Sequence, residues 1–311
     1  MTIALLFPGQ GSQHPGMGES WRETPSFDLA VRARARTGID VPHLLLHADA
    51  DELVRPQAAQ LSIFVHSCMV VDRLRDAGAL DDGPITAAAG HSLGEYSALV
   101  AAGVLTFDDG VRLVSERGAA MAAAAALRPG AMLAVVGLPP DRLAELCAAQ
   151  PDWWPANENA PEQIVVSGAA ETAGAMAERC RAAGARIVRP LAVGGAYHTP
   201  LMAPAAARLD RALAATGFAD AVLAVVCNVD AAVHRAAADF RPLLSAQLTG
   251  RVRWTAALHT LTGLGVTDMV ETGPGRTLTG LARRTVPGVA TRLCPTPEQA
   301  DLLVTSARET V

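Results

Sequence analysis

Ser92 is the residue of this chain best placed for nucleophilic chemistry. It lies in Gly90-His91-Ser92-Leu93-Gly94, which fits the pattern G-x-S-x-G. A small apolar segment (85–89) precedes this pentapeptide and an alanine-rich, helix-favouring segment follows it, which is the strand–turn–helix context of a nucleophile elbow. In isolation the pentapeptide would rather indicate a helix that begins at an N-cap serine. The context shifts the interpretation to a nucleophile held in a tight turn near helix N–H groups.

A second candidate is Arg117, on a helix predicted over 107–126. An inward-facing guanidinium must be paired or must face a cavity, because a buried unpaired charge is costly. Two interpretations stay open: a structural ion pair or snorkelling arginine, and a two-pronged donor for a carboxylate in a cleft. On a helical wheel at about 100° per residue, Arg117 falls inside an apolar arc formed by Val111, Val114, Gly118 and Met121.

Two further polar residues stand at ends of predicted elements. His198 lies just before a helix predicted over 200–216, with Thr199 as N-cap. A helix N-terminus disfavours the protonated imidazole and would keep His198 available as a base, although a lone loop histidine is more often a surface residue. Gln10 follows a strand predicted over 3–7 and stands between two glycines. It could place a donor near a reacting oxygen, or it could belong to an ordinary turn.

Composition excludes several classes of function. The net charge of −5 argues against nucleic-acid binding, and all 26 basic residues are arginine, so a Schiff-base lysine and a Walker-A lysine are excluded. The five scattered cysteines form no C-x-x-C pair, which indicates neither a disulfide framework nor a zinc site. The sequence shows no signal peptide and no apolar run long enough to span a membrane. We expect a cytoplasmic α/β enzyme that does not associate with membranes.

The middle of the chain predicts a small subdomain of its own. Strands are expected over 131–136, 154–157, 163–167 and 186–191, with helices over 140–149 and 170–183. That order, β-α-β-β-α-β, is the ferredoxin-like unit. We expect it to be inserted, over residues 127–193, into a larger α/β domain formed by residues 1–126 and 194–311.

Seven stretches taken together carry a resemblance to a known family. The chain resembles the malonyl-CoA:acyl carrier protein transacylases of fatty-acid synthesis and the related acyltransferases of polyketide synthases, over nearly its whole length. The resemblance implies an α/β-hydrolase-like large domain with an inserted ferredoxin-like small one, in agreement with the predicted elements. The stretches, in chain order, are FPGQGSQ, GHSLGEYSALVAAG, ERGAAM, NENAPEQIVVSG, GAYHTPLM, SAQLTGRVRW and ETGPGRTLTGL.

The resemblance also implies roles for individual residues. Ser92 would be the nucleophile, and His198 its general base and then the acid for the leaving thiol. Arg117 would clamp the free carboxylate of the malonyl group. In this family a main-chain carbonyl near the glutamine of SAQLTGRVRW, here Gln247, orients the histidine in place of an aspartate. The oxyanion hole would be formed by Gln10 and the backbone N–H of Leu93, and further pocket residues would be His91, Met121, Asn159 and Tyr197.

The substrates implied are malonyl-CoA and a phosphopantetheinylated acyl carrier protein, with no metal and no redox cofactor. Tyr197 precedes His198 at a position where malonyl-selective relatives often carry phenylalanine, so its bulk favours malonyl over methylmalonyl. Its hydroxyl is a departure that leaves room for a polar or unusual extender unit. Since carrier proteins are typically acidic, docking needs a local basic patch. We favour docking over the alternative of a solvated helix end, and the candidates are Arg276, Arg283 and Arg284, with Arg251 and Arg253.

Three alternative functions remain. The chain ends soon after the last motif, so we expect a free-standing transferase, which could be a trans-acting polyketide acyltransferase that loads an unusual dicarboxylic extender unit. A serine acyl hydrolase or thioesterase that acts on carrier-bound acyl groups shares the elbow but has no need of an inward arginine. A non-catalytic carrier-binding module would have no reason to keep Ser92, His198, Arg117 and Gln10 together.

Overall fold

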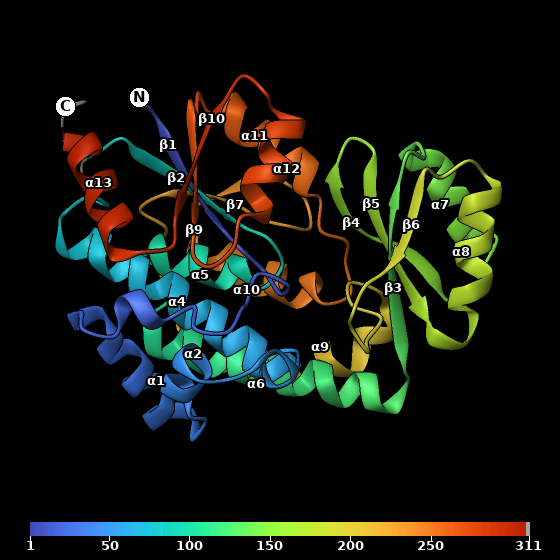
Figure 1. Cartoon of the computed structure of the whole chain (residues 1–311), viewed down its shortest axis with the longest axis horizontal. Coiled ribbons are helices and arrows are strands. Elements are labelled where there is room, and N and C mark those ends of the chain that lie inside the picture. Colours follow the sequence, from blue (N-terminus) through green and yellow to red (C-terminus); the bar gives the residue numbers. More distant parts are fainter. Residues whose placement is uncertain (82, 309–311) are drawn as a thin grey trace.

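Two β-sheets organise the chain, and the computed structural model describes residues 1–81 and 83–308 (Figure 1). The larger sheet has six strands in the order β10-β9-β1-β2-β7-β8. All neighbours in it are parallel except β7 and β8. Its strands are β1 (Ile3–Phe7), β2 (Ile85–Gly90), β7 (Ala224–Val226), β8 (Val233–His234), β9 (Asp268–Thr272) and β10 (Ala290–Cys294).

Helices cover both faces of the larger sheet, which explains why its central strands are apolar without alternation. In β1 the side chains of Ile3, Leu5 and Phe7 join one core, and those of Ala4 and Leu6 join the other. The first core is closed by α1 (Asp28–Thr37), α2 (Val41–Leu46), α3 (Ala50–Leu53), α4 (Pro56–Asp76), α5 (Gly94–Ala101), α6 (Phe107–Leu127), α9 (Ala203–Ala214), α10 (Ala237–Gln247) and α13 (Pro297–Arg308). The second core is closed by α11 (Trp254–Gly263) and α12 (Thr277–Thr285).

The smaller sheet lies beside the larger one, with its own two helices on its outer side (Figure 1). It is antiparallel, in the order β4-β5-β3-β6. The chain order β-α-β-β-α-β and this strand order confirm the predicted ferredoxin-like topology. Its elements are β3 (Gly130–Val136), α7 (Pro140–Ala148), β4 (Trp153–Ala160), β5 (Gln163–Ala169), α8 (Ala173–Ala182) and β6 (Ile187–Pro190).

Strand β4 is longer than predicted and also bridges to the segment before α11. It extends well beyond the predicted 154–157 because it pairs with β5 through two register shifts, which the sequence pattern alone does not show. Its far end contacts the segment before α11, where the N–H of Val252 donates to the carbonyl of Ala156 at 2.8 Å and that of Glu158 to the carbonyl of Val252 at 2.8 Å. Asn157 and Asn159 of β4 line the same cavity as Pro8 and His91, which directly follow β1 and β2.

Four short 3₁₀ turns accompany the α-helices in the described part of the chain. The helix predicted over 200–216 begins with a 3₁₀ turn, Pro200–Met202, before α9. Other 3₁₀ turns are Glu19–Trp21, Pro25–Phe27 and Ala170–Thr172. Within the described ranges, no helix is both long and apolar enough to cross a bilayer.

A buried histidine of α4 makes the stability of the fold depend on pH. His66 is 1% exposed beside Trp21, and burial lowers its pKa from 6.5 to about 4, with a smaller lowering from His14 and an opposing hydrogen bond to the Met17 backbone. Below pH 6.5 the unfolded chain binds a proton that the native state refuses, so the free energy of unfolding falls as the pH falls towards 4. The loss from this residue approaches about 3 kcal/mol.

A His66→Gln variant, which cannot titrate, should therefore show a flatter dependence of the urea midpoint on pH between 7 and 4.5 than the unchanged protein. His259→Gln, at an exposed position of α11, is the matched control and should keep the original slope. Equal slopes in the unchanged protein and in His66→Gln would contradict the assignment.

Candidate active site

Ser92 occupies a sharp turn between β2 and α5, with a φ of 53° that non-glycine residues rarely adopt. The flanking glycines are required by contact. A Cβ on Gly90 would lie 1.9 Å from the backbone carbon of Gly94, and a Cβ on Gly94 would lie 2.0 Å from the carbonyl oxygen of Phe7. The strand–turn–helix context inferred from the sequence is present, and the turn directs the Ser92 side chain into a cavity.

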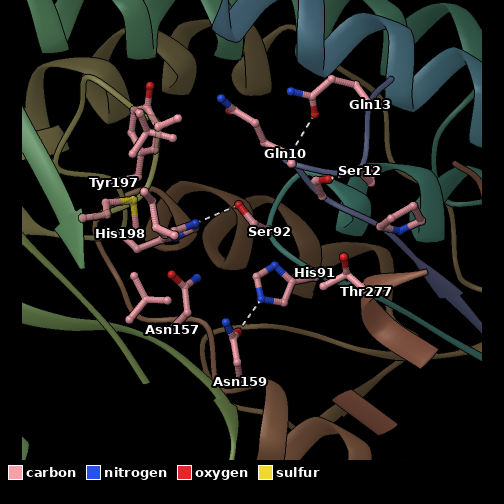
Figure 2. Close-up of a pocket in the computed structure, with 18 of the residues that line it drawn as sticks. Gln10, Ser12, Gln13, His91, Ser92, Asn157, Asn159, Tyr197, His198 and Thr277 are labelled. Atoms are coloured by element: carbon pink, nitrogen blue, oxygen red, sulfur yellow. Dashed lines mark hydrogen bonds between the residues drawn. The ribbon is translucent and has the colours of Figure 1, made fainter. Parts of the chain in front are cut away.

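His198 is in hydrogen-bond contact with Ser92 (Figure 2). Its Nε2 lies 2.7 Å from Ser92 Oγ, while Nδ1 faces the carbonyl oxygens of Gln247 at 2.9 Å and Gly250 at 3.2 Å. Carbonyls only accept hydrogen bonds, so Nδ1 carries the proton and Nε2 is left to accept the Ser92 hydroxyl. The arrangement is a serine–histidine pair oriented by main-chain carbonyls.

Burial is the largest cause of the lowered pKa of His198. The side chain is 5% exposed, and burial lowers its pKa to about 3, with a further lowering from the charge of Arg117. Thr199 Oγ1 accepts from the N–H of Leu201 at 3.3 Å and caps the 3₁₀ turn that leads into α9, so His198 stands directly before a helical N-terminus, as expected. At neutral pH the imidazole is neutral and able to take a proton.

Arg117 is buried, at 1% exposure, and forms no ion pair with any carboxylate among the described residues. Its Nη1 donates to Gln60 Oε1 at 2.7 Å, and its Nη2 donates to Ser92 Oγ at 3.0 Å and to Gln247 Oε1 at 3.2 Å. The guanidinium also lies 5.7 Å from the centre of the Tyr96 ring. The first interpretation, a structural ion pair or a snorkelling arginine, is therefore wrong. The second is consistent with the structure, because Arg117 lines a cavity.

The cavity has a volume of about 410 Å³ and lies between the two sheets. Ser92, His198 and Arg117 line it, and so do the residues proposed for the pocket: Gln10, His91, Met121, Asn159 and Tyr197. His91 Nε2 and Asn159 Oδ1 are 2.7 Å apart (Figure 2), which ties the nucleophile turn to β4. Every predicted pocket residue therefore borders one cavity.

The two residues expected to form an oxyanion hole, Gln10 and Leu93, differ in their relation to the cavity. Leu93 immediately precedes α5, and in the described part of the chain its backbone N–H has no main-chain acceptor. Gln10 follows β1 on a loop that Gln13 braces: Gln13 Oε1 accepts from the N–H of Gly11 at 2.7 Å, and Gln13 Nε2 donates to the carbonyl of Leu53 at 3.3 Å. Gln10 lines the cavity, whereas Leu93 is buried and is not among the lining residues.

Several buried polar residues at the site were not identified from the sequence, among them Gln60, Glu95 and Asn228. Glu95 lies in the first turn of α5, where burial raises its pKa to about 7, against the opposing effects of Gln247, the Asn228 backbone and Arg117. Glu95 and Gln60 each stand among largely apolar neighbours in the sequence, and this was the signal that could have identified them as buried polar residues. Asn228 follows the short strand β7 and carries no such signal.

The arginines proposed for docking lie on or beside α12. Arg276, Arg283 and Arg284 are all exposed. Thr277, Leu278 and Leu281 of the same segment line the active-site cavity, whereas Arg284 borders a separate hollow beside Glu162 and Arg186. Arg283 Nε donates to Thr291 Oγ1 at 2.8 Å, which gives that side chain a structural contact as well.

Comparison with known proteins identifies the family. Residues 4–248 match the model of the acyl transferase domain. The malonyl CoA-acyl carrier protein transacylase of Bacillus subtilis is 36% identical over 99% of this chain and 98% of its own length. That of Mycobacterium bovis is 37% identical over 97% of this chain and 99% of its own.

Two solved structures extend this likeness to the fold. The malonyl CoA-acyl carrier protein transacylase of Coxiella burnetii superposes with a TM-score of 0.92 at 31% identity, covering 99% of this chain and 98% of that one. A malonyl-transacylase solved in complex with its type II polyketide synthase acyl-carrier protein gives a TM-score of 0.92 at 33% identity, covering 98% of this chain and 100% of that one. The chain is a member of the acyl transferase family and belongs, within it, with the malonyl CoA-acyl carrier protein transacylases.

Proposed function

We propose that this enzyme moves a malonyl group from malonyl-CoA to the phosphopantetheine thiol of an acyl carrier protein, through a malonyl-Ser92 intermediate. The full-length similarity to malonyl transacylases supports the reaction class. One observation supports the choice of acyl group: a buried arginine without a carboxylate partner lies 3.0 Å from the proposed nucleophile. A dicarboxylic acyl group would supply that partner.

In the first half-reaction His198 Nε2 takes the Ser92 proton as Oγ attacks the thioester carbonyl. The backbone N–H of Leu93 and the amide of Gln10 donate to the oxyanion that forms. Collapse of this intermediate breaks the carbon–sulfur bond, and the proton held by His198 goes to the departing thiolate. The carbonyls of Gln247 and Gly250 stabilise the transient imidazolium by accepting from Nδ1, as an aspartate does in other serine enzymes.

Arg117 would hold the free carboxylate of the malonyl group with two parallel hydrogen bonds. In the structure Nη2 of Arg117 donates to both Ser92 Oγ and Gln247 Oε1. The malonyl carboxylate would therefore compete with Ser92 and Gln247 for the Nη2 donor. Gln60 keeps Nη1 in place from α4. His91, Met121, Asn159 and Tyr197 would form the walls around the acyl chain.

In the second half-reaction the carrier thiol attacks the malonyl-serine, and the same histidine accepts and returns the proton. Exclusion of water protects the intermediate from hydrolysis. This ping-pong sequence predicts parallel lines in double-reciprocal plots when malonyl-CoA is varied at several carrier concentrations. Intersecting lines would contradict a free malonyl-enzyme.

The chain organisation is part of the proposal. Residues 1–126 and 194–311 would form the catalytic domain and residues 127–193 the small subdomain, which contributes Asn159 to the cavity. We place the enzyme in the cytoplasm, because it would encounter both malonyl-CoA and the carrier protein in that compartment.

The exposed arginines beside α12 would bind the acidic carrier protein. Reversing two charges, in Arg283→Glu/Arg284→Glu, should raise KM for the carrier about tenfold, because two exposed pairs of roughly 0.5–1 kcal/mol each are lost. KM for malonyl-CoA should stay unchanged in steady-state assays. Arg179→Glu, at an exposed position of α8, is the matched control and should affect neither constant. An equal rise of KM for the carrier and for malonyl-CoA in the double variant would contradict the docking assignment.

A further inference from the structure

The backbone of Ser92 is held by side chains that come from distant segments. Its N–H donates to Asn228 Oδ1 at 2.6 Å. Its carbonyl accepts from Gln247 Nε2 at 2.9 Å, in addition to the N–H of Glu95 at 3.2 Å. A left-handed conformation at a non-glycine residue persists only where the surroundings impose it, because it costs of order 1–3 kcal/mol. These bonds are the contacts that impose it.

Asn228 connects both sides of the nucleophile turn. While its oxygen accepts from Ser92, its Nδ2 donates to the carbonyl of Gly90 at 2.6 Å. The two partners fix the orientation of the amide, because a carbonyl needs a donor and an N–H needs an acceptor. Asn228 is 1% exposed and does not line the cavity, so it acts on the turn and not on a substrate.

Glu95 fixes Asn228 in turn. Its Oε2 accepts from the backbone N–H of Asn228 at 2.9 Å. Glu95 is 1% exposed and lies in the first turn of α5, behind Ser92 as seen from the cavity lining. A polar chain therefore runs from α5 through the end of β7 to the backbone of the nucleophile, with each member paired.

We propose that Glu95 and Asn228 are positioning residues that hold the β2–α5 turn so that Ser92 Oγ meets His198 Nε2. This inference rests on the proposed role of Ser92 as the nucleophile. A misplacement of about 1 Å at a reacting centre can lower the rate by about 100-fold. Loss of the Asn228 amide should therefore lower the rate of serine acylation and leave substrate affinity nearly unchanged.

The test compares Asn228→Ala with the unchanged enzyme in two reactions of Ser92. The first is malonyl transfer, where kcat should fall about 100-fold while KM for malonyl-CoA changes less than about threefold. The second is sulfonylation of Ser92 by phenylmethylsulfonyl fluoride, followed by intact-protein mass spectrometry, which should slow by a similar factor. If the unchanged enzyme reacts with phenylmethylsulfonyl fluoride but not with malonyl-CoA, the proposed function is wrong. The sulfonylation rates of the unchanged enzyme and of Asn228→Ala still test the positioning role in that case.

Two further variants separate positioning from general destabilisation. Glu95→Gln keeps an acceptor for the Asn228 N–H and should retain activity within about threefold of the unchanged enzyme, whereas Glu95→Ala should resemble Asn228→Ala. This pair carries the test if Asn228→Ala fails to fold. Thr272→Val removes a buried hydroxyl away from the cavity and should lower Tm without lowering kcat. A folded Asn228→Ala enzyme, or a folded Glu95→Ala enzyme, with unchanged rates in both reactions would overturn the proposal.

Discussion

Replacement of His198 by alanine should lower kcat for malonyl transfer by about 10³-fold, within the range that a positioned general base contributes. The imidazole lies 2.7 Å from Ser92 Oγ with its accepting nitrogen towards the hydroxyl, and among the described residues Arg117 is the one other titratable side chain bonded to that oxygen. Pre-steady-state measurement of CoA release reports the acylation step. KM for malonyl-CoA should change little, because His198 is not expected to bind the carboxylate.

The matched control for this prediction is His14→Ala, at an exposed loop position, which should retain full activity. A His198→Ala variant that keeps its fold by circular dichroism and acylates within tenfold of the unchanged rate would show that another group takes the serine proton.

Replacement of Arg117 by alanine should reverse the preference between dicarboxylic and simple acyl donors. A charged hydrogen-bonded contact is worth about 1.5–3 kcal/mol, so kcat/KM for malonyl-CoA should fall roughly 10- to 150-fold. The acetyl group has no carboxylate for Arg117 to bind, so kcat/KM for acetyl-CoA should not fall when the arginine is removed. It should stay level or rise, because the variant no longer places a desolvated guanidinium beside the apolar acetyl group. The measurement is a competition between the two thioesters, read as acyl-enzyme masses.

Arg117→Lys is the informative companion to this variant. It keeps a positive charge but cannot form the two parallel hydrogen bonds, so it should recover only part of the malonyl activity. If Arg117→Ala lowered the malonyl and acetyl rates by the same factor, the arginine would serve the fold or the serine and not the carboxylate.

The elements that carry local signals were predictable. The turn at Ser92 was inferred from its glycines, and the structure shows why: a side chain at Gly90 or Gly94 would overlap backbone atoms. The inward direction of Arg117 followed from helical periodicity, because 3.6 residues per turn fix which side chains share a face. The four strands of the small sheet were found from their apolar runs, although the length of β4 depended on its pairing with β5.

Contacts between distant segments were not predictable from spacing. Arg112 and Glu116 stand four residues apart, which predicts an ion pair, yet Arg112 bonds Asp109 and Glu116 bonds Arg208 of α9. Asn228 meets Ser92 across 136 positions of the chain. Such contacts depend on how β7 and α9 pack, and a single sequence holds no record of that packing.

The most direct test of the proposed function is intact-protein mass spectrometry after mixing the enzyme with malonyl-CoA, methylmalonyl-CoA and acetyl-CoA, with Ser92→Ala as the control. We predict a malonyl adduct on the unchanged enzyme that is strongest with malonyl-CoA and absent from Ser92→Ala, with one equivalent of free CoA released per adduct. Retention of the adduct in Ser92→Ala would contradict the proposed nucleophile. A folded enzyme that forms no adduct and releases no CoA with any of the three thioesters would contradict the proposed transfer reaction.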